Sequence, residues 1–306
     1  MKLKFKAHQS FFVRNGWLYK GMTQIDDTKD EAGVSCLFQD QNEAVLKLGI
    51  GANMASSLRY WLEAFGLVEQ TSKNRSSLSF TEFGKLVYEY DKHFQSLGTL
   101  LLCHYQLSTN IEFASTWYYF FNEFRQKEFT KQDLAMGVRE WINAISPGTK
   151  VASSSIESDV DCLLRTYVYS KEIDDRFEDN KVSPFVSLNL ITKSIKTKNQ
   201  YFKRTLEPLQ IPPLISMFII LRQIEEKKYG RATLDLHDLL QKPKSIGRVL
   251  NFQVEQLISL VDFLESLGFV RIVRTAGLEQ LVITSEIKSS KTFLELYFKG
   301  LGQNEQ

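Results

Sequence analysis

The sequence lacks the features that mark secreted, membrane-spanning and disulfide-stabilised proteins. Its three cysteines, Cys36, Cys103 and Cys162, are odd in number and have no paired spacing. This argues against a disulfide framework and fits a reducing compartment. No apolar run is long enough to cross a bilayer, and the first residues, MKLKFKAHQS, lack the apolar segment of a secretory signal. We therefore expect a cytoplasmic protein without a membrane partner.

A strong excess of positive charge is also missing. The 306 residues include 38 Lys and Arg against 36 Asp and Glu, which gives a net charge of +2. A strongly basic chain would by itself indicate nucleic-acid binding, and this chain does not. If the protein binds DNA, its cations must gather on one surface while its acids lie elsewhere.

The linear motifs of common enzymes are absent. The four histidines are scattered, no cysteine–histidine pair has zinc spacing, and there is neither a phosphate-binding glycine loop nor a nucleophile elbow. The acidic clusters at 26–31 and 172–179 could hold magnesium or manganese, because hard cations prefer several carboxylate oxygens. Such clusters are more often solvated loops or helix ends, so the metal stays unknown.

The clearest unit in the chain runs from about residue 16 to residue 91. DQNEAVLKLGI (40–50) predicts a short helix with Asp40 at its N-cap, and MASSLRYWLEAFG (54–66) predicts a second helix that stops at Gly66. GLVEQTSKNRSSLSFT (66–81) predicts a hairpin with Lys73 and Arg75 at its tip. This order is that of a winged helix-turn-helix, which reads the major groove with its second helix and covers phosphates with its hairpin. Winged-helix units also serve as protein–protein adaptors.

The same order recurs after residue 205. Two helices are followed by the long helix FQVEQLISLVDFLESLG (252–268), and a hairpin then turns at TAG (275–277). The helical spacing predicts that the long helix buries an apolar stripe formed by Val254, Leu257, Ile258, Val261 and Leu264.

Residues 92–190 read as mostly helical. The aromatic stripe in FASTWYYFFNEF (113–124) is more typical of core than of base stacking, and residues 129–168 resemble a weak third helix-turn-helix unit. TKSIKTKNQYFKR (192–204) interleaves five cations with Tyr201 and Phe202 and contains no acid. Such a stretch suits a phosphate backbone with a base to stack on, or equally a solvated linker.

We therefore predict a mainly α fold made of tandem winged helix-turn-helix units, with short β-hairpin wings, around a helical middle region. The expected domains are an N-terminal winged-helix domain at 1–91, a helical middle domain with a basic linker at 92–204, and a C-terminal winged-helix domain at 205–306.

The candidate DNA contacts are groove-facing residues of the second helix, cations of the wing and its flanks, and the basic stretch of the middle region. They are Arg14, Lys20, Asn53, Ser56, Ser57, Arg59, Lys73, Arg75, Lys196, Lys198, Lys203 and Arg204. A nuclease centre, if present, is expected at His8, Asp26 and Asp27, because a histidine can act as a general base beside a metal-holding pair of acids. His8 and Ser10 could equally be hydrogen-bonded fasteners of the N-terminal strand.

Several separated motifs resemble a known bacterial family. HQSFFVRNGWLYKG (8–21), LGIGANMASSLRYWLEAFGL (48–67), LCHYQLSTN (102–110), ASTWYYFFNEF (114–124), GRVLNF (247–252) and TAGLEQLVI (275–283) are similar to the SspB-type family. This is a domain-of-unknown-function family encoded in DNA phosphorothioation operons. The resemblance extends from about residue 5 to residue 298.

The resemblance implies a DNA-binding component of a phosphorothioate modification and antiphage defence system. It further implies work beside a cysteine desulfurase, a sulfur-transfer ATPase and an ATPase partner, and nicking of one strand so that sulfur can be incorporated. The alternative is a non-catalytic adaptor or regulator that recruits the modification enzymes. One departure is that Gln106 stands where the family pattern leads us to expect a second histidine after His104, which weakens any site built on that pair.

Overall fold

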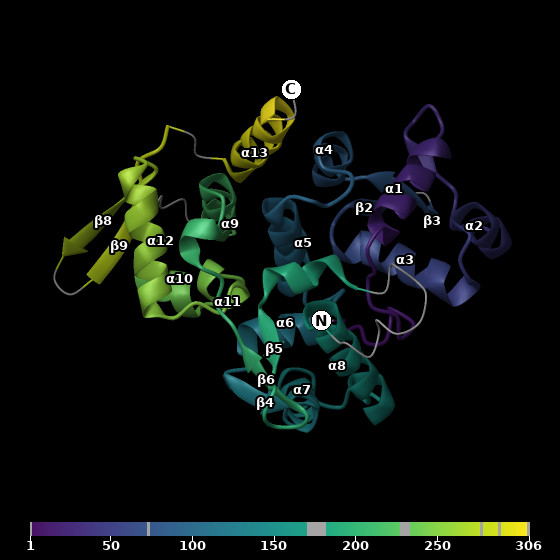
Figure 1. The fold of residues 1–306 in the computed structure, drawn as a ribbon, viewed down its shortest axis with the longest axis horizontal. Helices are drawn as coiled ribbons and strands as arrows, with labels where there is room; N and C mark the ends of the chain where they lie inside the picture. Colours follow the sequence, from purple (N-terminus) through teal and green to yellow (C-terminus); the bar gives the residue numbers. More distant parts are fainter. Residues whose placement is uncertain are drawn as a thin grey trace.

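The computed structural model describes residues 2–71, 74–169, 182–226, 233–275, 278–286 and 289–304 (Figure 1). The chain is mainly helical. Within the described residues, the strands form three small antiparallel sheets of three strands each. The mainly α prediction is therefore confirmed.

The N-terminal unit contains four helices and one sheet whose strand order is β1-β3-β2. Its elements are α1 (Trp17–Asp27), β1 (Val34–Ser35), α2 (Gln41–Leu48), α3 (Ala52–Ala64), β2 (Val68–Thr71), β3 (Asn74–Phe80) and α4 (Glu82–Tyr90). Asp40 caps α2 as predicted, because its carboxylate accepts the backbone N–H groups of Asn42 and Glu43. The helix ends at Gly49, whose φ of 61° suits glycine.

The middle unit repeats this strand order as β4-β6-β5. Its elements are α5 (Leu97–Thr109), α6 (Ser115–Tyr118), the π-helix η1 (Tyr119–Glu123), β4 (Glu128–Thr130), α7 (Lys131–Ile145), α8 (Ser153–Tyr167), the 3-10 helix η3 (Pro184–Leu188), β5 (Ile191–Lys193) and β6 (Gln200–Lys203). Most of the basic stretch 192–204 is therefore a β-hairpin rather than an irregular linker. Most of the aromatic stripe, including Trp117, Phe120 and Phe121, is buried core.

The C-terminal unit has the strand order β7-β9-β8. Its elements are the 3-10 helix η4 (Pro208–Gln210), α9 (Pro213–Glu225), β7 (Thr233–Asp235), α10 (Leu236–Gln241), α11 (Ile246–Val249), α12 (Val254–Ser266), β8 (Val270–Thr275), β9 (Leu278–Ile283) and α13 (Ser290–Asn304). The predicted burial of Val254 and Ile258 is wrong, since they are 53% and 43% exposed. Leu257, Val261 and Leu264 are buried as predicted.

The three units pack around one continuous hydrophobic core. In each, a short strand pairs with the last strand of the following hairpin, and two α-helices in the first two units or three in the C-terminal unit lie between them. Helix α13 returns from the C-terminal unit to lie beside α9 and α4 (Figure 1). There Lys291 forms an ion pair with Glu82, and the Tyr297 hydroxyl bonds that of Ser96. Among the described helices, none combines the length and apolarity needed to span a membrane.

Candidate phosphate-binding site

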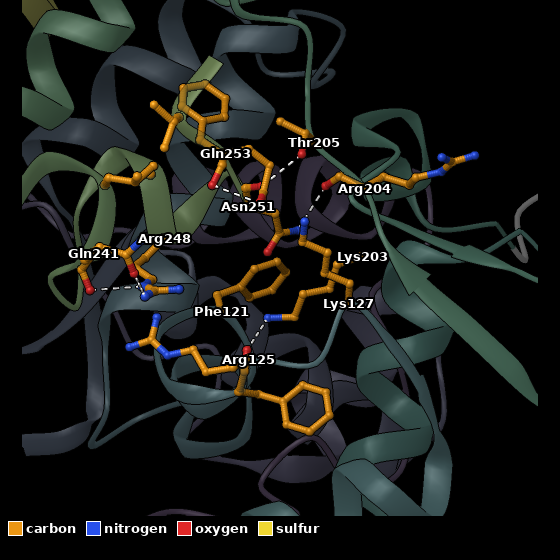
Figure 2. Close-up of a pocket in the computed structure, with 15 residues that line it drawn as sticks. Phe121, Arg125, Lys127, Lys203, Arg204, Thr205, Gln241, Arg248, Asn251 and Gln253 are labelled. Carbon is orange, nitrogen blue, oxygen red and sulfur yellow. Dashed lines mark hydrogen bonds between the residues drawn. The ribbon is translucent and has the colours of Figure 1, made fainter. Parts of the chain in front are cut away.

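A cavity of about 470 Å³ lies between the middle and C-terminal units. Three segments far apart in the sequence line it, and Figure 2 shows their side chains around the opening. The segments are the end of η1 with the turn into β4 (121–127), the end of β6 (203–205), and the turns that join α10, α11 and α12 (240–254).

The charge of the lining is entirely positive. Its cations are Arg125, Lys127, Lys203, Arg204 and Arg248. No aspartate or glutamate of the described residues takes part in the lining, and its remaining polar side chains are hydroxyl or amide groups. The side chains of Arg125, Lys127 and Arg204 are exposed and have no carboxylate partner in the described part of the chain. A concave site with this charge attracts anions, above all groups that match the guanidinium fork.

Part of the cavity wall is apolar. Phe121, Phe124, Leu240 and Phe252 line it, and each is buried. These residues belong to the shared core, and its close packing keeps this part of the wall rigid.

Arg248 is held in position by the preceding helix. Its Nε donates to the Gln241 carbonyl at 2.9 Å, and its Nη2 donates to the Gln241 side-chain oxygen. Both acceptors are neutral, so the guanidinium charge remains available to a ligand. On the facing segment, the Asn251 amide donates to the Arg204 carbonyl at 3.0 Å, and the Thr205 hydroxyl donates to the Asn251 carbonyl at 2.8 Å. These bonds fix β6 against the C-terminal unit.

Lys203 occupies the inner side of the pocket. Its Nζ donates to the carbonyls of Phe120 and Phe124 at 2.6 and 2.7 Å, and it lies 4.4 Å from the centre of the Phe120 ring. It thereby caps carbonyls at the end of η1. Burial lowers the pKa of Lys203 to about 7, and the positive charge of Arg125 acts in the same direction. Near neutral pH this side chain is therefore divided between its charged and neutral forms.

Four predicted DNA contacts lie on one hairpin. Lys203 and Arg204 lie at its pocket end, and Lys196 and Lys198 are exposed in the loop between β5 and β6. The hairpin thus connects the pocket to a second group of cations.

The α3 residues that we predicted to face the DNA groove differ in their exposure. Asn53 is exposed, while Ser56 and Arg59 are partly exposed, with the Arg59 Nε 3.7 Å from a Glu63 oxygen. The prediction for Ser57 is wrong, because it is fully buried and its hydroxyl donates to the Phe11 carbonyl at 3.3 Å. The N-terminal segment packs across this face of α3.

The remaining cations of the N-terminal unit make local contacts. The Arg14 guanidinium lies 5.1 Å from the Trp17 ring, and Lys20 donates to the Leu48 carbonyl at the end of α2. Lys73 and the side chain of Arg75 lie outside the described residues.

The predicted nuclease residues do not form a centre. His8 is 1% exposed, accepts the Ser10 N–H at Nδ1 and bonds Asp159 at 2.8 Å through Nε2. Asp26 pairs with Lys29, and Asp27 accepts a bond from Gln24. His8 therefore acts as a fastener of the N-terminal segment, which is the alternative that the sequence left open.

The described residues do not fit a metal held by several protein ligands. No three His, Cys, Asp or Glu side chains gather closely enough in the described ranges. The acidic cluster at 172–179 lies outside those ranges. No catalytic step is therefore assigned to a metal.

The sequence predicted only Lys203 and Arg204 among the lining residues. Arg125 and Lys127 follow the aromatic stripe, whereas Arg248 and Asn251 lie more than a hundred residues further along the chain. Each is an ordinary polar residue in its local sequence. Only the packing of the middle unit against the C-terminal unit brings them together.

Comparisons with known proteins agree with this fold. The chain is similar to a crystal structure of magnesium ion-bound SspB, with a TM-score of 0.81 and 22% sequence identity, covering 97% of this chain and 88% of that chain. It is similar to a second SspB crystal structure with a TM-score of 0.80 and 23% identity, at the same coverage. The search of curated proteins gives no match. A family model, described as a protein of unknown function (DUF4007), matches residues 5–298. Since that match spans nearly the whole sequence, the chain belongs to the DUF4007 family.

Proposed function

We propose that this chain is a DNA-binding protein of a bacterial DNA phosphorothioation system. It holds the sugar–phosphate backbone with the basic β5–β6 hairpin and the cationic pocket at the end of that hairpin. The observation that carries the proposal is the pocket lining, which includes five cationic residues and no carboxylate from the described residues. Backbone phosphates supply the sequence-independent part of DNA affinity and are bound by such groups.

The finer fold assignment belongs to the same proposal. We interpret the three units as tandem winged helices, because each has α-helices between its first strand and its hairpin, two in the first two units and three in the C-terminal unit, and the strand order first–third–second. In a winged helix the hairpin lies over phosphates, which is the role proposed for β5–β6.

The middle unit is favoured over its neighbours by its accessible charges. In the N-terminal unit, part of α3 is covered and Arg59 lies beside Glu63. Helix α12 of the C-terminal unit exposes Glu255, Asp262 and Glu265, and helix α8 of the middle unit also exposes two acids, so neither helix suits phosphates and the hairpins decide between these two units. The β5–β6 loop instead exposes lysines.

The proposed pathway rests on the likeness to SspB and on the DUF4007 match. In that setting the partners would be DNA, a cysteine desulfurase, a sulfur-transfer ATPase and an ATPase partner, in the cytoplasm. The three free cysteines fit a reducing compartment.

Nicking of one DNA strand is the further part of this proposal, with magnesium or manganese as cofactor. The magnesium ion in one SspB structure supports it. The rival is a non-catalytic DNA-binding adaptor, which is favoured by the absence of a three-ligand metal cluster in the described residues.

Two assays on the full chain test these proposals. Filter binding with a duplex should show affinity that falls as salt rises, because binding displaces counterions from the phosphates. Lys196→Ala/Lys198→Ala should weaken binding more than Lys73→Ala/Arg75→Ala, which removes the same number of charges from the first hairpin. Relaxation of a supercoiled plasmid with magnesium or manganese would support nicking, whereas binding without relaxation would support the adaptor. If the affinity for the duplex is negligible and does not change with salt, the proposed DNA binding is wrong.

A further inference from the structure

We propose that the cationic pocket holds the terminal phosphate of a DNA strand, as found at a nick, in preference to an internal phosphodiester. This inference rests on the proposed DNA binding and names the part of the DNA that the pocket recognises.

The shape of the cavity favours a strand end. The cavity is concave, and its lining includes four buried apolar residues, Phe121, Phe124, Leu240 and Phe252. An internal phosphodiester continues as a strand on both sides, so two stretches of strand must leave a concave site that holds it. A terminal phosphate enters with its free oxygens first and leaves only one strand at the opening. A cavity of about 470 Å³ has ample room for this group and part of its nucleotide.

The charge of the lining favours the same group. An internal phosphodiester carries a single negative charge, whereas a phosphomonoester carries about −1.5 to −2 at pH 7 and offers three acceptor oxygens. Arg125 and Arg248 come from different segments of the lining and lie on the same side of the pocket, whereas the Arg204 side chain extends away from them (Figure 2). Guanidinium groups bind phosphate oxygens in pairs, so two arginines from different segments suit a group with three free oxygens.

Lys203 adds a dependence on pH. Its Nζ is already bonded to two carbonyls, and the charged groups that line the pocket with it are Arg125, Lys127, Arg204 and Arg248. No histidine or carboxylate among the described residues shares the lining. A bound phosphate dianion would favour the ammonium form, so binding would take up protons. Affinity for the strand end should therefore fall as pH rises from about 7 to 9, where the phosphate itself stays dianionic.

The test uses the full chain and one DNA sequence in four forms: intact duplex, nicked duplex with hydroxyl ends, and the same nick with a 5′-phosphate or a 3′-phosphate. We expect at least one phosphorylated nick to bind about tenfold more tightly than the hydroxyl nick, as charge-assisted hydrogen bonds are gained. Arg125→Gln/Lys127→Gln, which removes two exposed cations of the lining, should abolish this difference. Both side chains are exposed, so the variant should remain folded, which circular dichroism would check. Arg271→Gln, which changes an exposed arginine outside the pocket, should retain the difference.

The other outcomes distinguish failure of the strand-end inference from failure of the proposed DNA binding. Equal affinity for all four duplexes would overturn the strand-end inference and leave DNA binding intact. Failure to bind any duplex at low salt would overturn the proposed function as well. If deoxyadenosine monophosphate binds and the double variant loses it, while no duplex binds, the phosphate belongs to a free nucleotide and the strand-end inference is wrong.

Discussion

At the scale of single residues, buried polar groups act as fasteners between distant segments. Asp159 on α8 is 1% exposed and accepts hydrogen bonds from the Lys6 backbone, the His8 ring and the Thr116 hydroxyl, at 2.7, 2.8 and 2.8 Å. One carboxylate thus ties the N-terminal segment to α6 and α8. This arrangement explains why a histidine near the start of the chain is structural.

Removing this carboxylate should destabilise the protein. We expect Asp159→Ala to lower the free energy of unfolding by about 3 kcal/mol, because two buried donors and one partly buried donor lose their acceptor. Asp161→Ala on the same helix removes an exposed acid that pairs with Lys131 and should change stability by less than about 1 kcal/mol. Urea denaturation measures both values. Similar effects of the two substitutions would contradict the fastener role.

The stability of the fold depends on pH through His104. Burial lowers its pKa to about 4 from the ordinary 6.5, and the ring bonds the Tyr167 hydroxyl at 2.7 Å and the Val249 carbonyl at 2.8 Å. The neutral ring is thus retained in the folded state, while the unfolded chain takes up a proton below pH 6.5. The contribution of His104 to stability should be complete above pH 6.5 and decrease as pH falls toward 4. Denaturation curves at pH 7 and pH 5 should differ less for His104→Gln than for the wild type. An equal pH effect in both proteins would be the contrary result.

At the scale of elements, the position of Arg248 depends on a close approach of two short helices. A Cβ at Gly247 would lie 2.6 Å from the Leu240 Cα and 2.7 Å from backbone oxygens of Leu239 and Leu240. Only glycine allows α11 to lie this near to α10. The same approach places Arg248 against Gln241.

Gly247→Ala should therefore affect stability and DNA binding together. We expect a loss of about 2 kcal/mol in unfolding free energy, since rigid backbone must move, and weaker duplex binding as Arg248 is displaced. Gly300→Ala in α13 is the matched control, because no atom lies within 4 Å of the added Cβ. It should be neutral or slightly stabilising. Thermal unfolding and filter binding test both variants, and a harmless Gly247→Ala would contradict the geometry.

Local signals explain which elements the sequence predicted. Asp40 and Gly66 mark helix ends through their own backbone chemistry, so the helices they limit appear in the structure. The residues 192–204 gave no clear hairpin signal, because β5 and β6 are short and β6 is completed by pairing with distant β4. The sequence predicts that Ser57 faces the DNA groove, because neighbouring residues of the helix are polar. Contact with Phe11, more than forty residues earlier, is a tertiary effect that helical spacing does not report.

At the scale of the whole molecule, the candidate site depends on how the units pack. The pocket takes cations from the middle and C-terminal units, and helix α13 ties the C-terminal unit back to the N-terminal one. The sequence supplied Lys203 and Arg204 through their local cluster of cations. Arg125 and Arg248 had no comparable signal, since the sequence does not state which faces meet. A chain of net charge +2 therefore concentrates its cations by folding.

The salt dependence of duplex binding tests this account most directly. Arg125→Gln/Arg204→Gln/Lys196→Ala/Lys198→Ala removes four cations from the pocket and its hairpin. If each contacts a phosphate, the slope of log affinity against log salt should become shallower by about 3 to 4, at roughly 0.9 per contact. An unchanged slope in the folded variant would mean that DNA, if bound at all, lies elsewhere on the protein.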